Sequence, residues 1–193
     1  MHLKIKAFLT EFIILLLNLS TFLGCRSSMS SCSKMAKSLT TFEILKFWIK
    51  STITAILLAA GVQILTSFMR NGKENLPSEK ECLKLTEQHA TNTFSSFDEF
   101  YPFYLCEHSV GTTKLFHFIA SANALTIFAT LLTRKWQTKL FLFGFVQAYG
   151  FAWFSHFFVE HNRPATWTYP TYSFFGDFKM FLQILTLQFP PFV

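Results

Sequence analysis

The sequence has 193 residues, of which 51% are hydrophobic, 18% aromatic and only 15% charged. A soluble domain usually carries about 25% charged residues, so this composition indicates an integral membrane protein. The formal net charge of +6 comes from lysines and arginines that lie mostly between the apolar segments, which suits contact with lipid headgroups. Because no basic stripe with interleaved aromatic residues is present, we expect a lipid membrane and not a nucleic acid as partner.

The first segment, residues 1–25, is typical of a signal anchor or a signal peptide. Lys4 and Lys6 precede a long apolar run, which Glu11 interrupts. A charged start followed by an apolar core directs a chain to the membrane. The residues before Cys25 match a lipoprotein cleavage box only loosely, so we favour an uncleaved anchor over a cleaved signal peptide.

Two segments of different composition follow. Residues 26–70 begin as a Ser-rich linker and continue as an uncharged apolar stretch, 51–69, which is long enough to be a transmembrane helix. Residues 71–99 are polar and mixed in charge, and they predict a solvent-exposed connection with one short helix at 78–89. His89 in this connection is interpreted as a solvated surface histidine.

The cysteine spacing indicates no particular framework. The four cysteines are Cys25, Cys32, Cys82 and Cys106. They form no C-x-x-C pair and no zinc-binding spacing. Two disulfides and four free thiols are both compatible with the sequence, and we favour isolated cysteines.

Two apolar segments in the second half, 115–133 and 140–159, are joined by the short charged link 134–139. A link of this length requires an antiparallel hairpin of helices. The fold class predicted for the chain is therefore all-α, a polytopic membrane protein of about four transmembrane helices. Its C-terminal hairpin is expected to carry the functional site.

Polar residues gather where the second apolar segment ends. His156 and Glu160 are one helical turn apart and share a face, and Tyr149 lies on the same stripe. Asn162 and Arg163 follow directly. Ionisable side chains at the end of a transmembrane helix are costly to place there, which makes them functional candidates.

Counting from the link between the two segments places two histidines at one depth. His117 and His156 are equally far from the middle of the link, and each residue of a helix rises by about 1.5 Å. His108 joins them if the helix breaks at Gly111. Together with Glu160 they form a nitrogen and oxygen ligand set that suits iron and leaves positions open for oxygen and substrate. Zinc is compatible with the same ligands, and a haem between two histidines or purely structural histidines are the alternatives.

Four blocks of the second half carry a resemblance to a known family. They are YPFYLCEHS at 101–109, LFHFI at 115–119, YGFAWFSHFFVEHNRPATWTYP at 149–170 and SFFGDFKMF at 173–181. They resemble the membrane family that includes the yeast 2-hydroxy-fatty-acid dioxygenase, in its branch with an NRPAT block. The resemblance covers about residues 95–185, which makes residues 100–193 a dioxygenase-like membrane domain.

The resemblance implies an Fe(II)-dependent enzyme of the endoplasmic reticulum membrane. Such an enzyme uses molecular oxygen to remove the first carbon of 2-hydroxy fatty acids by α-oxidation, in the breakdown of phytosphingosine. The histidines that recur in the family match His108, His117 and His156 here, and its acidic residue matches Glu160. His161 stands where family members commonly have Gly or Lys, so it is not expected to be a ligand.

The remaining candidate residues are given roles by their chemistry. Glu160 and Tyr149 are expected to take part in catalysis. Arg163, with Asn162 beside it, is expected to bind the substrate carboxylate, because guanidinium groups match carboxylates bidentately. The alternative function is a membrane scaffold or lipid-binding protein without catalysis, in which the histidines are structural. The sequence carries no signal that identifies a protein partner.

Overall fold

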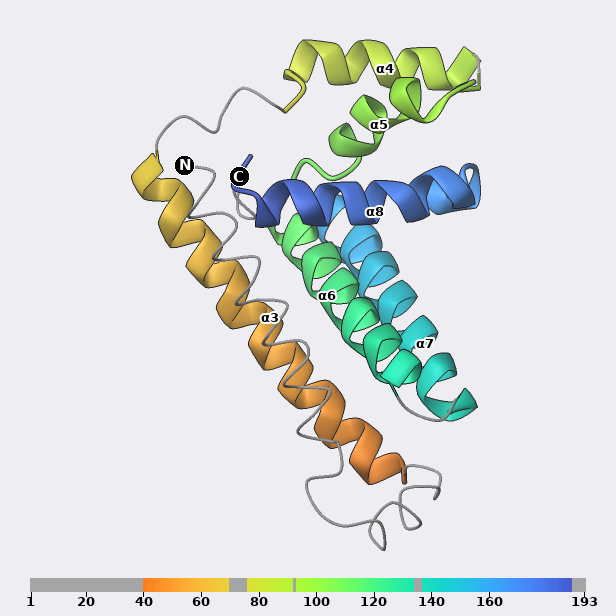
Figure 1. Cartoon of the computed structure of the whole chain (residues 1–193). Helices are drawn as coiled ribbons and strands as arrows, with labels where there is room; N and C mark the ends of the chain where they lie inside the picture. Colours follow the sequence, from red (N-terminus) through yellow and green to blue (C-terminus); the bar gives the residue numbers. More distant parts are fainter. Residues whose placement is uncertain (1–39, 70–75, 92, 134–136, 189–193) are drawn as a thin grey trace, which may run out of the picture.

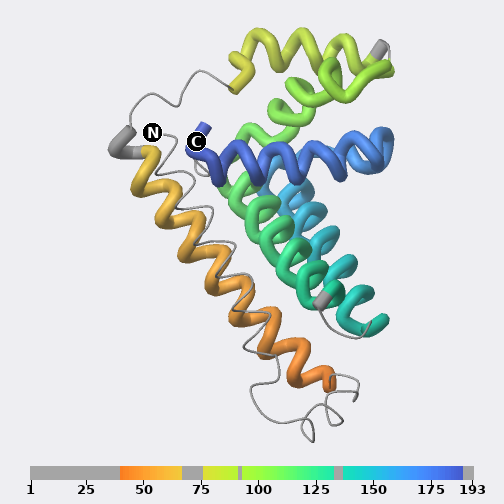
Figure 2. Tube along the Cα trace, in the orientation of Figure 1, coloured from red at the N-terminus to blue at the C-terminus, as the bar shows by residue number. Residues whose placement is uncertain are grey.

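The computed structural model describes residues 40–69, 76–91, 93–133 and 137–188. Within these ranges the chain forms six α-helices and no strand (Figures 1 and 2). In chain order the elements are α3 (Thr41–Met69), α4 (Glu79–Thr91), α5 (Phe97–Cys106), α6 (Gly111–Thr133), α7 (Thr138–Ser155), the π-helix η2 (His156–Glu160), the 3₁₀ turn η3 (Ala165–Trp167) and α8 (Pro170–Leu185). The predicted all-α class is confirmed.

Three helical segments are long and apolar enough to cross a membrane. They are Thr41–Thr66, Gly111–Leu132 and Thr138–Glu160. The sequence predicts about four transmembrane helices. That number is not confirmed, because the first predicted segment, residues 1–25, lies outside the described residues. The Ser-rich linker that follows it lies outside them as well.

The predicted C-terminal hairpin is present, and α6 and α7 run antiparallel along most of their length (Figure 2). The two helices approach closely at Gly144 of α7. A Cβ atom at this position would lie 3.1 Å from the side chain of Ile127 on α6. A side chain at position 144 would therefore require the Ile127 side chain to shift.

A buried polar cluster attaches α3 to the hairpin. Asn123 of α6 is fully buried. Its Oδ1 accepts a hydrogen bond from Ser51 Oγ at 2.5 Å, and its Nδ2 donates to Thr52 Oγ1 at 2.9 Å. Nδ2 also donates to Gln147 Oε1 of α7 at 3.4 Å. Polar side chains that bond across helices in this way hold membrane helices together, so three helices are joined at one level.

The helix α8 lies crosswise over the end of the hairpin, with α5 and then α4 beyond it (Figure 1). The contact between α8 and α5 is close, because a Cβ atom added to Gly176 would lie 3.0 Å from the ring of Tyr104. Tyr101 also donates a hydrogen bond to Gln183 Oε1 of α8. This crosswise helix covers the end of α6 and α7 and brings its own side chains over their polar residues.

The short helix predicted in the polar connection is present as α4, and its side chains make contacts that were not predicted. Cys82 of α4 and Cys106 at the end of α5 form a disulfide, so the interpretation of these two as isolated cysteines is wrong. Cys25 and Cys32 lie outside the described residues. His89 is also not a solvated surface residue, because its ring packs against Phe94, Phe103 and Tyr169.

Loss of this disulfide is expected to loosen α4. The helix contacts the rest of the described chain mainly through α5, and a link across 24 residues contributes about 3.5 kcal/mol by loop entropy. In Cys82→Ser we expect faster amide hydrogen exchange in α4 and unchanged exchange in α6 and α7. Cys106→Ser should give the same profile. Equal exchange of α4 in both variants and the wild type would contradict this role.

Candidate metal centre

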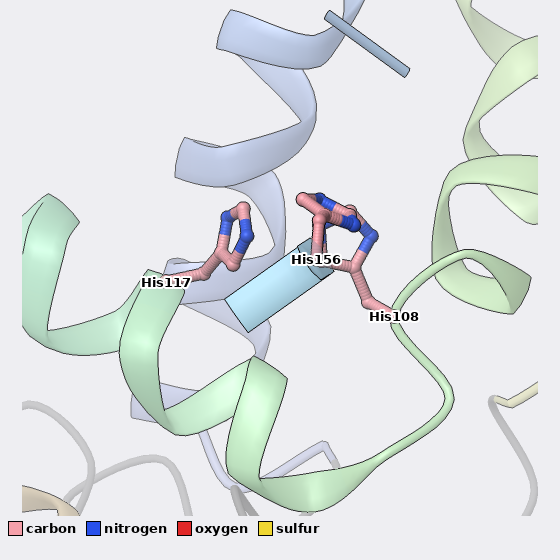
Figure 3. A group of neighbouring side chains, drawn as sticks. All are labelled: His108, His117 and His156. Atoms are coloured by element: carbon pink, nitrogen blue, oxygen red, sulfur yellow. The ribbon is translucent and has the colours of Figure 1, made fainter. Parts of the chain in front are cut away.

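Three histidines from different elements meet at the end of the hairpin beneath α8. His108 lies in the turn after α5, His117 on α6, and His156 where α7 passes into η2 (Figure 3). Their ring centroids are 4.3, 4.7 and 5.3 Å apart. One nitrogen of each ring lies within 4.8 Å of a nitrogen of each of the others. All three side chains are buried, with exposed fractions of 1%, 4% and 2%.

The helix break that His108 needs in order to join the other two histidines is present. The helix α5 ends at Cys106 and α6 begins at Gly111, so the four residues between them turn the chain back. This turn places His108 beside His117, although the two are nine residues apart and would face opposite sides of a continuous helix. His117 and His156 meet across the hairpin, as their equal distance from its link predicts.

Each histidine has its Nδ1 atom engaged by a different acceptor. His108 Nδ1 donates to the Tyr104 carbonyl at 2.6 Å. His117 Nδ1 donates to Asp177 Oδ1 of α8 at 2.6 Å, and Tyr104 donates its hydroxyl to the same oxygen. A carbonyl or carboxylate oxygen can only accept, so Nδ1 of both rings carries the proton. In the neutral form of each ring the lone pair is then on Nε2.

The third histidine is oriented by Asn162. His156 Nδ1 donates to Asn162 Oδ1 at 2.8 Å. The Nδ2 atom of Asn162 donates to two acceptors, the backbone carbonyl of Glu107 at 3.0 Å and its carboxylate at 2.9 Å. Because both partners of Nδ2 accept only, the amide orientation is determined. His156 therefore has the same tautomer as the other two histidines.

A π-helical turn brings Asn162 to this position. η2 widens the last turn of the α7 segment, and His161 after it has a left-handed backbone with φ 57°. The chain reverses there, and the Asn162 N–H donates to the His156 carbonyl at 3.1 Å. Such π-turns are rare and occur frequently at functional sites.

The Nε2 atoms show whether a metal ion fits here. Among the described residues, His108 Nε2 and His117 Nε2 are buried without a hydrogen-bond partner. Leaving a buried polar atom unpaired is costly, and an ion between the rings would remove that cost. Burial and the neighbouring rings of His117 and His156 hold the pKa of His108 well below its ordinary value, which keeps the ring neutral, as a metal ligand must be. The residues fit a metal.

Glu160 is the last residue of η2. Its carboxylate bonds to the turn before α6 and does not belong to the histidine cluster. Its Oε1 accepts from the Val110 N–H at 2.8 Å, and its Oε2 accepts from Ser109 Oγ at 3.2 Å. Lys114 donates to the Ser109 carbonyl in the same turn. Glu160 thus holds the turn that contains His108, and its assignment as a metal ligand stays a prediction.

The other predicted site residues lie in different surroundings. Asn162 contacts the histidine cluster directly, as described above. Tyr149 lines an apolar groove whose lining also includes His117 and Asp177. Arg163 is exposed, in the loop after η2. The sequence places Asp177 in the SFFGDFKMF block, where lining the site and lying at the membrane interface are both compatible with it, and its pairing with His117 is not predicted.

The apolar groove runs between α6, α7 and α8 and has a volume of about 430 Å³. Its walls are made almost entirely of apolar side chains. His117 and Asp177 mark the end at the histidine cluster, while Leu131 and Phe141 mark the end near the link of the hairpin. A long apolar molecule in this groove would have one end beside the candidate metal ligands.

These features define a class of protein: a helical membrane protein with a buried three-histidine centre next to an apolar groove. Residues 94–189 match the family described as 2-hydroxy-palmitic acid dioxygenase Mpo1-like. The chain belongs to this family, and the matched region contains all three histidines. A search of curated proteins and a search of solved structures each found no match.

The hydrogen bond from His117 to Asp177 is expected to strengthen metal binding. In Asp177→Asn we expect the affinity for Zn(II), which takes the same nitrogen ligands, to fall by about tenfold or more, because such outer partners orient the ligating ring and raise its basicity. Calorimetric titration of the purified protein measures this. Asp98→Asn, at an exposed carboxylate of α5, is the control. Equal affinities of the two variants would show that Asp177 does not support the site.

Proposed function

We propose that this protein is an Fe(II)-dependent dioxygenase that removes the first carbon of 2-hydroxy fatty acids by α-oxidation. Membership of the family described as 2-hydroxy-palmitic acid dioxygenase Mpo1-like supports this reaction. One structural observation carries the proposal. Three buried imidazoles have Nδ1 engaged by an acceptor, and the Nε2 atoms of His108 and His117 are buried without a hydrogen-bond partner.

The proposed metal ligands are His108, His117 and His156. Imidazole ligands suit iron and zinc alike, and the dioxygenase description favours iron. When bound, the iron would supply Lewis-acid and redox chemistry for the reaction of a 2-hydroxy acid with molecular oxygen. The protein would supply orientation of the substrate and a site that is shielded from water.

The residues around the cluster have proposed roles in holding the substrate. Arg163, exposed after η2, is proposed to bind the substrate carboxylate. Asn162 is proposed to assist it, although both ends of its amide already bond to His156 and Glu107. Tyr149 is proposed to act on the bound substrate from the groove wall. The endoplasmic reticulum membrane is the proposed location, and the breakdown of phytosphingosine the proposed source of the acid.

The activity is tested with the purified full chain, Fe(II) and isotopically labelled 2-hydroxypalmitate. We expect a product of fifteen carbons and stoichiometric iron, because three histidines hold the ion. His156→Ala is expected to lose the iron and to reduce turnover at least 100-fold. His161→Asn is the matched control, since Asn also tolerates the left-handed backbone.

Two results would contradict the proposal. Retention of iron and turnover in His156→Ala would show that the three histidines do not form the metal centre. A purified protein that takes up no metal would favour the scaffold or lipid-binding alternative.

Glu160→Gln tests whether the carboxylate is a ligand. We expect this variant to keep its iron, because both oxygens of Glu160 are bonded to the turn before α6. We also expect a stability loss of about 0.5–1 kcal/mol, because a negative charge at a helix N-terminus is favourable. Metal analysis and thermal unfolding measure the two effects. Loss of iron as complete as in His156→Ala would instead establish Glu160 as a ligand.

A further inference from the structure

The apolar groove has a floor of small side chains and a rim of large ones. The floor includes Ala124 of α6 and Ala148 of α7, both half-buried. The rim includes Phe128, Phe145 and Phe174, whose exposed fractions are 58%, 57% and 53%. Small residues between exposed phenylalanines leave a channel along the hairpin.

The groove is long as well as narrow. On α6 its lining extends from His117 to Leu131, which is about 21 Å at 1.5 Å per residue. The hydrocarbon part of one bilayer leaflet is about 15 Å thick. The acyl chains of the lipids fill this thickness, so a long acyl chain has about this length. The groove is therefore long enough for the whole chain of a long fatty acid.

The two ends of the groove differ in polarity, and this difference indicates what kind of molecule the groove binds. His117 and Asp177 lie at one end, and they belong to the histidine cluster. The other end, at Leu131 and Phe141, is apolar. A bilayer lipid has its headgroup at the membrane surface and carries two chains. A single acyl chain with a small polar head matches one channel that has one polar end.

We propose that this groove binds the acyl chain of a single long-chain acid, with its carboxyl end at His117, and that Ala124 and Ala148 determine the accepted chain length. The inference rests on the proposed function and specifies which acids the site accepts. Ala124 is seven residues from His117, and Ala148 is eight residues from His156. At 1.5 Å per residue both lie about 10–12 Å from the cluster, facing each other across the antiparallel hairpin.

A bulky side chain at this depth is expected to close the distal half of the groove. For Ala148→Phe and Ala124→Phe we expect the ratio of kcat/KM for 2-hydroxypalmitate over 2-hydroxyoctanoate to fall at least tenfold. Val146→Phe is the matched control, because Val146 lies at a similar depth of α7 but is 68% exposed and outside the groove. Its ratio should equal that of the wild type.

Photo-crosslinking provides a second measurement that does not require turnover. A long-chain 2-hydroxy acid with a diazirine near its methyl end is added to the purified full chain, and the labelled peptides are identified. We expect labelling near Leu131 and Phe141 in the wild type and its loss in Ala148→Phe.

The two measurements separate failure of the groove from failure of the proposed function. Turnover with an unchanged chain-length ratio in both Phe variants would overturn the groove assignment, and so would labelling spread over all lipid-facing helices. Groove labelling without turnover of any acid would support the groove and overturn the dioxygenase.

Discussion

The arrangement of this protein depends on the hydrogen bonds to Nδ1 of three buried histidines. Three imidazoles in so small a volume could otherwise point N–H groups at one another. The acceptors come from three places: the Tyr104 carbonyl on α5, Asp177 on α8 and Asn162 after η2. The π-turn at the end of α7 brings Asn162 into position and the crosswise α8 brings Asp177, while the helix break before α6 turns His108 toward the other two rings.

The histidine centre lies at a boundary between two kinds of surroundings. On one side are polar groups, which include Glu107, Asn162 and the turn that Glu160 holds. On the other side, past His117, the apolar groove begins. A molecule with a polar head and a long apolar tail could place its head among the polar groups and its tail in the apolar groove. The proposed substrate and the proposed acyl groove thus follow from one feature of the site.

Much of the hairpin could be predicted from the sequence, because it depends on counting. The rise of a helix is nearly constant, so the equal spacing of His117 and His156 from the link predicted that they meet. The role of Asp177 could not be predicted in this way, since α8 crosses the hairpin at an angle that no spacing reveals. Cys82 and His89 lie in a polar stretch, but their partners belong to α5 and beyond, and sequence distance does not indicate such contacts.

The sequence by itself determined the helical membrane class, the antiparallel hairpin and the common depth of its two histidines. These properties follow from composition and from the regular geometry of the backbone, which act over neighbouring residues. Only the tertiary structure decided which acceptor bonds to Nδ1 of each ring, that Glu160 bonds to the turn before α6, and where the apolar groove runs. Such features depend on how helices pack against one another, because side chains from distant segments become partners only when the helices are in contact.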